Sequence, residues 1–239
     1  TTAPGEEDTN GDGVIDPVKP SIEIEEAADG VNAEEIADGI QTVVTLPEGS
    51  IAGDTVTLTI TDDQGVKTTV EHTVTAEEAA AGSSKVTIPN DATGVTQDGD
   101  YSIVATVTDV SGNTSAPSDT TNITVDTTAP DAPTIKTQTD GALTVTPAAD
   151  DTTEVSVTYT DEDGNEQTIT ATKDPATGDW SSADLPAGGS IDPSTGAITI
   201  PADQVDTSED VTATAKDDAG NIADATQAGD TTAPGQGEG

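Results

Sequence analysis

The feature that most constrains the fold of this chain is an internal repeat. The segment Thr-Thr-Ala-Pro begins at Thr1, Thr127 and Thr231, and the last two copies follow Asp126 and Asp230. A period of about a hundred residues is a normal length for a β-sandwich domain. The spacing therefore predicts two copies of one structural unit, with an additional glycine- and aspartate-rich segment near the start of the first.

The interior of the two copies also aligns. Residues 56–65 match 155–164, residues 85–89 match 197–201, and residues 108–113 match 216–221, in the same order. In the first match, Val56, Leu58 and Ile60 alternate with threonine, and the second copy repeats the alternation. Period-two alternation of β-branched residues places the apolar side chains on one face of a half-buried strand.

Turn signals between the apolar runs give about seven strands per repeat, which predicts an all-β chain of two tandem immunoglobulin-like sandwiches joined end to end. Strands of the first repeat are expected at residues 21–25, 40–46, 55–61, 66–74, 85–88, 101–108 and 122–125, with a helical turn at 77–81. Strands of the second are expected at residues 134–137, 142–146, 154–160, 167–172, 197–200, 211–216 and 222–226. The domains are expected to be an acidic linker with a calcium loop (1–16), domain 1 (17–126), domain 2 (127–230) and the start of a further linker (231–239).

Two aromatic residues receive structural interpretations. Tyr101 opens the sixth strand, where immunoglobulin-like folds place a tyrosine whose hydroxyl bonds backbone upstream. Trp180 is interpreted as a core or edge plug of the second repeat rather than as a ligand platform.

Composition excludes several classes of function. The chain has 47 acidic residues against 6 basic ones, a net charge of −41. Binding nucleic acid or an anionic membrane surface requires a basic stripe, and none exists. The chain lacks cysteine and an apolar run of membrane-spanning length, and it is expected to be an internal piece of a longer exported protein.

Catalytic chemistry is also not expected. His72 is the single histidine, so the chain cannot form a zinc set or a Cys/His nucleophile pair. A glycosidase-like pair of carboxylates would need a cleft with aromatic sugar platforms, which one Trp and two Tyr do not supply. The chain is therefore predicted not to be an enzyme.

Asp-Thr-Thr-Ala-Pro at the junctions, Asp-x-x-Gly-Asn at the ends of the sixth strands and the acidic, Thr-rich, Cys-free composition together carry a resemblance. Over roughly residues 17–234, the chain resembles the bacterial Ig-like repeats of giant RTX and biofilm-associated adhesins that type I secretion exports. The resemblance implies a secreted, cell-surface extender that serves adhesion and biofilm formation, with calcium at the junctions. Its partners would be neighbouring Ig-like repeats and calcium ions, without direct membrane insertion, and the chain would be monomeric.

Immunoglobulin topology predicts which acidic loops meet at the junction between the repeats. The third and fourth strands of the first repeat are joined by a turn at one pole, where its last strand also ends. The loops after the second and sixth strands of the next repeat lie at the facing pole. The predicted junction set is Asp62, Asp63, Asp126, Asp150, Asp151, Asp217, Asp218 and Asn221. Calcium, which takes 6–8 oxygen ligands, would relieve the repulsion among these carboxylates. The alternative is that these residues simply form β-turns, where Asp and Gly are favoured.

A second candidate calcium site lies near the start of the chain. Residues 8–16 fit the first part of an EF-hand-like loop, with Asp8, Asn10, Asp12, Val14 and Asp16 at positions one, three, five, seven and nine. Position twelve is a lysine instead of the bidentate glutamate, a departure that resembles dockerin-like and thrombospondin type 3 loops more than a full EF-hand. The site could be completed by Asp109 and Asn113 from the loop after the sixth strand, and the alternative is an acidic linker without an ion.

Two other functions stay open at the level of sequence. One is an Ig-like accessory module that binds glycan or a host protein, which would need an exposed aromatic or apolar patch. The other is an accessory region of an enzyme, which rests on the dockerin-like residues 8–16 alone.

Overall fold

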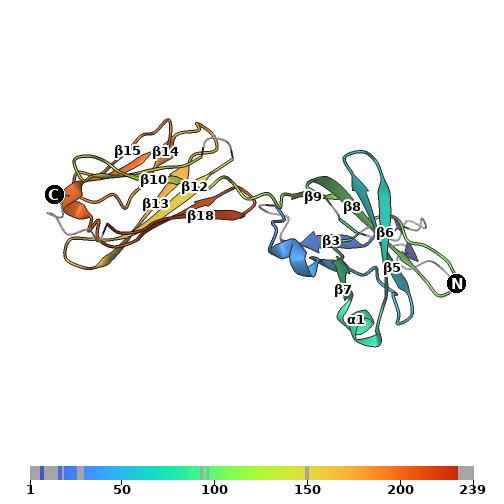
Figure 1. The fold of residues 1–239 in the computed structure, drawn as a ribbon. Helices are drawn as coiled ribbons and strands as arrows, with labels where there is room; N and C mark the ends of the chain where they lie inside the picture. Colours follow the sequence, from blue (N-terminus) through green and yellow to red (C-terminus); the bar gives the residue numbers. More distant parts are fainter. Residues whose placement is uncertain are drawn as a thin grey trace. The chain divides into compact units, whose positions relative to one another are not determined.

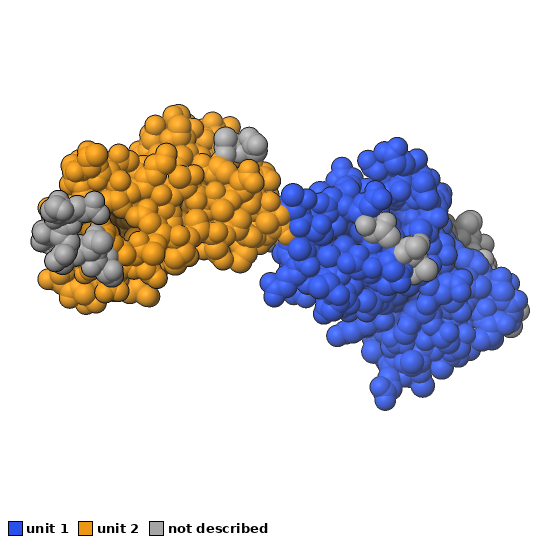
Figure 2. All heavy atoms as spheres, viewed as in Figure 1, with its two compact units in different colours: residues 1–128 blue, residues 129–239 orange. Residues whose placement is uncertain are grey.

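The computed structural model describes residues 6–7, 16–17, 19–25, 30–91, 94–95, 97–148 and 151–230. It divides into two compact units, Thr1–Thr128 and Ala129–Gly239 (Figure 2). Each unit is built around two antiparallel sheets packed as a sandwich (Figure 1), so the predicted all-β class is confirmed. None of the helices in the described ranges is long and apolar enough to cross a membrane.

Unit 1 packs a three-stranded sheet, in the order β3-β4-β7, against a four-stranded sheet, in the order β6-β5-β8-β9. The strands are β3 (Ser21–Ile24), β4 (Ile40–Thr45), β5 (Thr55–Asp62), β6 (Lys67–Thr73), β7 (Ser83–Ile88), β8 (Gly99–Thr108) and β9 (Thr121–Val125). The short strands β1 (Glu6–Glu7) and β2 (Asp16–Pro17) pair with each other. A 3-10 helix (Glu35–Asp38) precedes β4, and α1 (Ala76–Ala81) lies where the helical turn was predicted.

The position of β6 differs from the immunoglobulin order, in which the fourth strand joins the sheet of the first, second and fifth. Here β6 pairs along its length with β5 and belongs to the other sheet. The reason is the tight turn between them, in which the Asp62 amide donates to the Val66 carbonyl at 3.1 Å. So short a connection keeps two strands side by side and cannot carry the chain across the sandwich.

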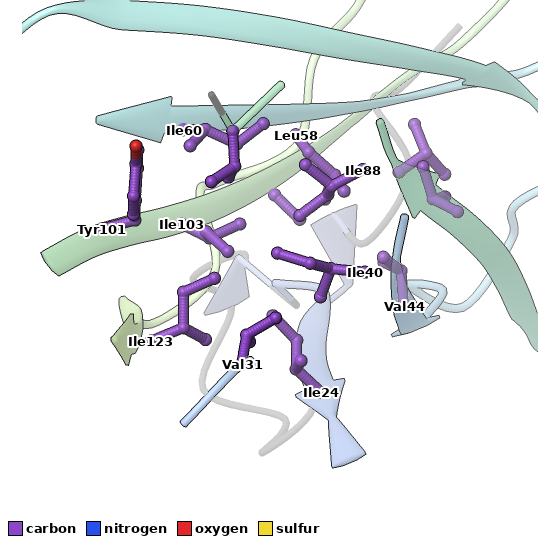
Figure 3. Packing of buried hydrophobic residues seen from close by; sticks show 14 of the residues in the cluster. Ile24, Val31, Ile40, Val44, Leu58, Ile60, Ile88, Tyr101, Ile103 and Ile123 are labelled. Atoms are coloured by element: carbon purple, nitrogen blue, oxygen red, sulfur yellow. The ribbon is translucent and has the colours of Figure 1, made fainter. Parts of the chain in front are cut away.

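The core of unit 1 follows the alternation read from the sequence. Val56, Leu58 and Ile60 are each 1% exposed or less, and they pack with residues of β4, β7 and β8 (Figure 3). Tyr101 lies at the edge of this core, and its hydroxyl donates to the Gln97 carbonyl at 2.8 Å. The predicted tyrosine corner is therefore confirmed.

Unit 2 has the same plan with two additional strands. Its sheets have the orders β10-β11-β16-β15 and β14-β13-β12-β17-β18. The strands are β10 (Thr134–Thr137), β11 (Leu143–Thr146), β12 (Glu154–Thr160), β13 (Glu166–Lys173), β14 (Trp180–Ser181), β15 (Ser190–Ile191), β16 (Ile198–Ile200), β17 (Val211–Lys216) and β18 (Ile222–Gln227), with a 3-10 helix at Ala202–Gln204. The sequence did not predict β14 and β15, because two-residue strands are too short to show a period.

Trp180 belongs to the core of unit 2. It is 5% exposed and lies in β14, paired with Lys173 at the edge of β13. A Cβ atom added at Gly196 would lie 2.7 Å from the indole Cδ2 and 2.8 Å from the Pro147 Cγ. The indole therefore packs against the bare backbone of this glycine, and its interpretation as a core plug is confirmed.

The chain runs through each unit from one end to the other. In unit 1, the first residue of β3, Ser21, pairs with Thr45 at the end of β4. The next strand, β5, begins opposite Thr108 at the end of β8, so the chain enters at this end of the sandwich. The last residue of β9, Val125, pairs with Gly99 at the opposite end of β8. Unit 2 repeats this arrangement, because β12 begins opposite the end of β17 and β18 ends opposite its start. Entry and exit therefore lie at opposite ends of both sandwiches.

Candidate cation-binding loops

Four hairpin turns, two in each unit, share the pattern Asp-x-x-Gly-x and begin at Asp62, Asp109, Asp161 and Asp217. In each turn the glycine amide donates to the carbonyl of the aspartate, at 3.0 to 3.3 Å. The glycines adopt φ values of 79°, 91°, 82° and 95°, a region that side chains of L-residues disfavour. The four turns are thus one local structure used four times.

In three of the turns the aspartate also accepts a hydrogen bond from an asparagine side chain, and in the Asp161 turn the Asn165 Nδ2 donates to both carboxylate oxygens at 3.3 and 3.4 Å. Asp109 Oδ1 accepts the amides of Ser111 and Asn113 at 2.8 Å, and its Oδ2 accepts Asn113 Nδ2 at 2.7 Å. Asp217 accepts the amide and the Nδ2 of Asn221, both at 2.9 Å, and both residues are buried. The structure therefore brings together Asp109 with Asn113 and Asp217 with Asn221, and it gives each pair a role in closing a turn.

These hydrogen bonds lower the pKa of two of the turn aspartates, Asp109 and Asp161. The side-chain and backbone donors of Asn113 hold the pKa of Asp109 below its ordinary value. The backbone amide of Asn165 lowers the pKa of Asp161, aided by the side chain of Gln167. The donors favour the ionised form, so both turns stay anionic further into the acid range than a free aspartate would.

The unit 1 members of the predicted junction set lie at one end of one sheet. Asp62 pairs with Tyr101 across β5 and β8, and Asp126 directly follows Val125 at the same end. Asp62 Oδ1 accepts the amides of Gln64 and Val66, at 3.0 and 2.8 Å, while Asp63 beside it is exposed. The strand β8 separates Asp62 from Asp126, so these carboxylates lie at one end of the sheet but not on adjacent strands.

The unit 2 members lie at the end of unit 2 where the chain enters it. Thr153, two residues after Asp151, donates its amide to the carbonyl of Lys216, which precedes Asp217. Asp151 and Asp218 are exposed, and Asp150 lies outside the described residues. Each unit is described by itself, so an ion shared by the two halves of the set stays a prediction.

The candidate site near the start of the chain falls largely outside the described residues. Asp8, Asn10, Asp12 and Val14 lie in that part, while Asp16 lies in β2, opposite Glu7. The predicted contribution of Asp109 and Asn113 to this site therefore also stays a prediction.

The chemistry of the donors fits calcium. The predicted ligands are carboxylate, amide and carbonyl oxygens without nitrogen or sulfur donors, which is the set a hard cation prefers. Within the described ranges, no three His, Asp or Glu side chains form a group that could hold a metal ion. Calcium at these loops would therefore draw on backbone carbonyls and water as well as on carboxylates.

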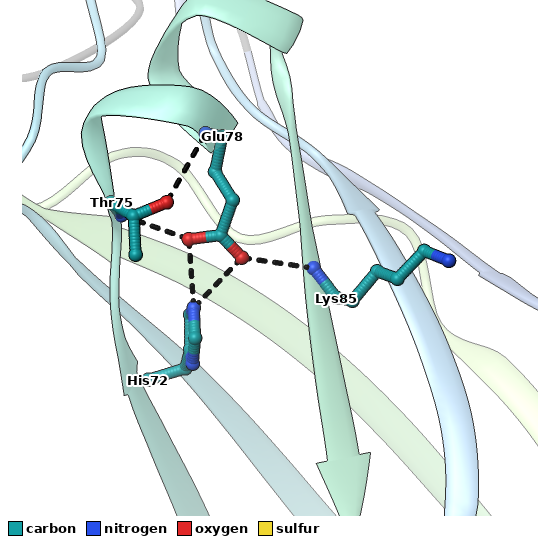
Figure 4. Close-up of polar contacts among 4 residues, drawn as sticks. All are labelled: His72, Thr75, Glu78 and Lys85. Atoms are coloured by element: carbon teal, nitrogen blue, oxygen red, sulfur yellow. Dashed lines mark hydrogen bonds and ion pairs between the residues drawn. The ribbon is translucent and has the colours of Figure 1, made fainter.

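One polar cluster was not predicted from the sequence and has a structural role (Figure 4). The Glu78 carboxylate on α1 accepts His72 Nε2 of β6 at 2.9 and 3.0 Å, and the amides of Thr75 and Lys85 at 2.8 and 3.3 Å. Thr75 and Glu78 form a capping box at the start of the helix. Because β6 and β7 belong to different sheets, Glu78 connects the two layers of unit 1. Only the capping box has a short-range sequence signal.

Acidification is expected to weaken this connection. Burial raises the pKa of Glu78, but the hydrogen bonds from His72 and Thr75 outweigh it and lower the pKa from 4.5 to about 2. The folded pKa lies below the unfolded one, so the stabilisation is present above 4.5 and is lost as the pH falls through about 2. We expect Glu78→Gln to destabilise unit 1 by about 1 kcal/mol at neutral pH, because the amide can still cap the helix but lacks the charge that strengthens the hydrogen bonds from His72 and the backbone. The difference from wild type should vanish near that lower pKa.

The measurement is thermal unfolding of the full chain by circular dichroism across this pH range, for wild type and Glu78→Gln. Glu77→Gln is the matched control, because Glu77 is exposed on the same helix turn. A constant difference in melting temperature between wild type and Glu78→Gln at every pH would contradict the assignment.

Comparison with known proteins gives structural similarities only. No family model and no curated protein matches the chain. The chain is similar to a Ca²⁺-stabilized adhesin that helps an Antarctic bacterium reach out and bind ice, with 23% identity, a TM-score of 0.42, and coverage of 88% of this chain and 47% of that chain. It is also similar to a 1.5-MDa bacterial ice-binding adhesin (21% identity, TM-score 0.36, coverage 89% and 64%) and to a two-domain fibronectin type III segment from chicken tenascin (13% identity, TM-score 0.30, coverage 88% and 99%).

This chain thus spans about half the length of the first of these proteins. At such scores the similarities say nothing about ligands or activity. The fold and the loops define a structural class: two β-sandwich units in one chain, each with Asp-x-x-Gly turns at both ends and each crossed from end to end.

Proposed function

We propose that this chain is a spacer segment of a secreted bacterial cell-surface adhesin, and that it acts structurally rather than as an enzyme. Calcium bound by the acidic loops would stiffen the joint between its units. One observation carries the spacer role: in each unit the chain enters at one end of the sandwich and leaves at the other. Units of this kind add length when they are placed in series.

The dimensions support this role. Strands of up to ten residues, such as β8, rise about 3.3 Å per residue, so each unit contributes on the order of 30 Å along its strands. Length then depends on the number of copies and not on a special site. The net charge of −41 opposes compaction of such a chain wherever multivalent cations are scarce.

The spacer role is tested by scattering. Chains that carry one, two or four additional copies of residues 127–230 are compared with the 239-residue chain. The maximum dimension should rise by about 30 Å or more with each copy, in proportion to copy number. A maximum dimension that levels off after the first copy would show that the units fold back on one another, and it would contradict the proposal.

The calcium component is tested separately by thermal unfolding and scattering in excess calcium and in EGTA, with magnesium at equal ionic strength as the control. A ligand at a hundred times its dissociation constant stabilises the folded state by about 2.7 kcal/mol, which is readily measured. The triple substitution of Asp63, Asp151 and Asp218 by Asn should abolish the response of the maximum dimension to calcium, because this response reports on the joint. A matched triple substitution of the exposed Asp179, Asp184 and Asp203 should preserve it. If melting temperature and maximum dimension do not respond to calcium, the stiffening mechanism is wrong and the fold is unaffected.

A further inference from the structure

We infer that Asp98 and the Asp-Thr-Thr part of the repeated motif form a latch, which fixes the direction in which the chain leaves unit 1 through hydrogen bonds of the chain itself. The latch consists of Asp98, Asp126, Thr127 and Thr128. The latch goes beyond the spacer proposal, because it concerns the conformational order of residues 126–128. It does not depend on whether the chain acts as a spacer.

The carboxylate of Asp98 accepts three hydrogen bonds from the exit segment. Its Oδ1 accepts the Thr127 amide at 3.0 Å and the Thr127 hydroxyl at 2.7 Å, and its Oδ2 accepts the Thr128 hydroxyl at 2.8 Å. Both oxygens are therefore engaged by the two threonines of the motif. Threonine carries its hydroxyl donor on a β-branched carbon, and rotation about its χ1 is restricted. The two hydroxyls are therefore partly oriented before they bind Asp98.

The loop that carries Asp98 is itself anchored. The residue before Asp98, Gln97, accepts the Tyr101 hydroxyl at 2.8 Å, and the residue after it, Gly99, begins β8 opposite Val125. The tyrosine corner thus holds the acceptor of the latch close to the end of β9. Partial desolvation raises the pKa of the exposed Asp98, but the hydrogen bonds from Thr127 and Thr128 have the larger, opposite effect and hold this pKa below its ordinary value.

The exit segment is also held by a second segment of unit 1. Val31 forms a parallel bridge with Val125: its amide donates to the Thr124 carbonyl at 2.8 Å, and its carbonyl accepts the Asp126 amide at 3.0 Å. The Asp126 carboxylate in turn accepts the Thr128 amide at 3.0 Å. The chain from Thr124 to Thr128 is therefore fixed by hydrogen bonds to Val31 and to Asp98.

The latch limits where the joint can bend. Thr127 and Thr128 move with unit 1, so the first residue after it with independent backbone freedom is Ala129. Ala129 precedes Pro130, which disfavours the helical region for it, and proline fixes its own φ near −65°. Much of the stiffness of the linker thus comes from its sequence and from Asp98, independently of any ion.

Unit 2 uses the corresponding aspartate differently. The strand pairing makes Asp206 the counterpart of Asp98, and its Oδ1 accepts the amide and the hydroxyl of Ser208 at 2.9 and 2.6 Å. This carboxylate closes a turn of its own, and the threonines of the third copy of the motif, Thr231 and Thr232, lie outside the described residues.

The test is nuclear magnetic resonance relaxation and amide hydrogen exchange on the full chain in EGTA. In the wild type we expect order parameters near 0.85 at Thr127 and Thr128, as in rigid backbone. In Asp98→Ala they should fall below about 0.6, while Ile123 of β9 stays rigid. Exchange of the Thr127 amide should accelerate about ten-fold, because this amide loses a charged acceptor.

Lys67→Gln removes an exposed charge from the same end of unit 1 and should leave these values unchanged. The double substitution Thr127→Val and Thr128→Val removes the hydroxyl donors and keeps the side-chain shape, so it tests the latch even if Asp98→Ala fails to fold. Mobile threonines in the wild type in EGTA, or rigid ones in both variants, would overturn the latch. Neither result bears on the length increments that test the spacer role.

Discussion

Replacing Trp180 by alanine should destabilise unit 2 by about 3–5 kcal/mol, the usual cost of truncating a buried aromatic side chain. The indole is 5% exposed and packs against the backbone of Gly196, where the indole and Pro147 together leave no room for a side chain on the glycine. The segment between β13 and β16 contributes β14 to one sheet and β15 to the other. Trp180 anchors this segment, so its loss should expose the core between the two sheets.

The measurement is differential scanning calorimetry of the full chain, with circular dichroism as a second probe. The transition of unit 2 should fall by on the order of 12 °C or more, since 1 kcal/mol corresponds to about 4–8 °C in a domain of this size. The transition of unit 1 should not change. In the wild type, indole fluorescence reports on unit 2 alone, because Trp180 is the only tryptophan in the chain.

Trp180→Phe is the matched variant, because it retains an aromatic ring of smaller volume and should lose less stability than the alanine variant. Gly196→Ala tests the same contact by changing the glycine instead of the tryptophan. Its φ of 71° and the 2.7 Å approach to the indole both oppose a side chain at this position. Equal melting temperatures for wild type and Trp180→Ala would show that the indole contributes nothing to the core.

Regular strands could be predicted from the sequence because they alternate. Residues 55–61 and 154–160 carry apolar side chains at every second position, and both ranges form strands. The turns were equally accessible, since Asp and Gly three residues apart define the local hydrogen bonds of each hairpin. The sequence pattern did not show to which sheet β6 belongs. This depends on whether the connection before β6 crosses the sandwich, and the alternation of side chains carries no information about such a crossing.

At the candidate site, too, contacts within one turn could be predicted from the sequence and contacts between distant segments could not. Asp109 with Asn113 and Asp217 with Asn221 could be paired from sequence, because four residues separate the partners within one turn. Asp98 could not be found in this way, since its partners lie about thirty residues further along the chain and meet it only through the pairing of β8 with β9. The repeated Asp-Thr-Thr was visible as a motif, but a motif does not show its acceptor.

The regular pairing along β8 has a break just before β9 begins, and two buried serines, Ser115 and Ser118, bridge it. Regular pairing of β8 with β9 ends at Ile103, opposite Thr121. Beyond that point the Ala105 amide donates to Ser118 Oγ at 2.9 Å and the Val107 amide donates to Ser115 Oγ at 3.0 Å. The hydroxyls take the place of strand carbonyls as acceptors. The Ser115 and Ser118 amides still donate to the Val107 and Ala105 carbonyls, at 2.8 and 2.9 Å, on either side of Pro117, which has no amide to donate. A proline between two serines is the signal that would have indicated this break.

Each hydroxyl is therefore the acceptor of a buried amide, and its removal leaves that amide without a partner. Leaving a buried donor unpaired costs about 1–3 kcal/mol, so we expect losses of this size for Ser115→Ala and for Ser118→Ala. The double variant should lose roughly 2–6 kcal/mol if the two amides act independently. Such a loss approaches the whole stability of a small domain, so unit 1 of the double variant should be largely unfolded at elevated temperature while unit 2 stays folded.

Unfolding of the full chain, monitored separately for the two units by hydrogen exchange, measures these losses. Ser111→Ala is the control, because Ser111 is exposed in the neighbouring turn and contributes its amide, not its hydroxyl, to Asp109. Ser→Thr at positions 115 and 118 keeps the hydroxyl and should recover part of the stability if the added methyl group fits. If both alanine variants match the Ser111→Ala control and the Ala105 and Val107 amides stay protected, then water satisfies these amides and the serines do not support the broken strand.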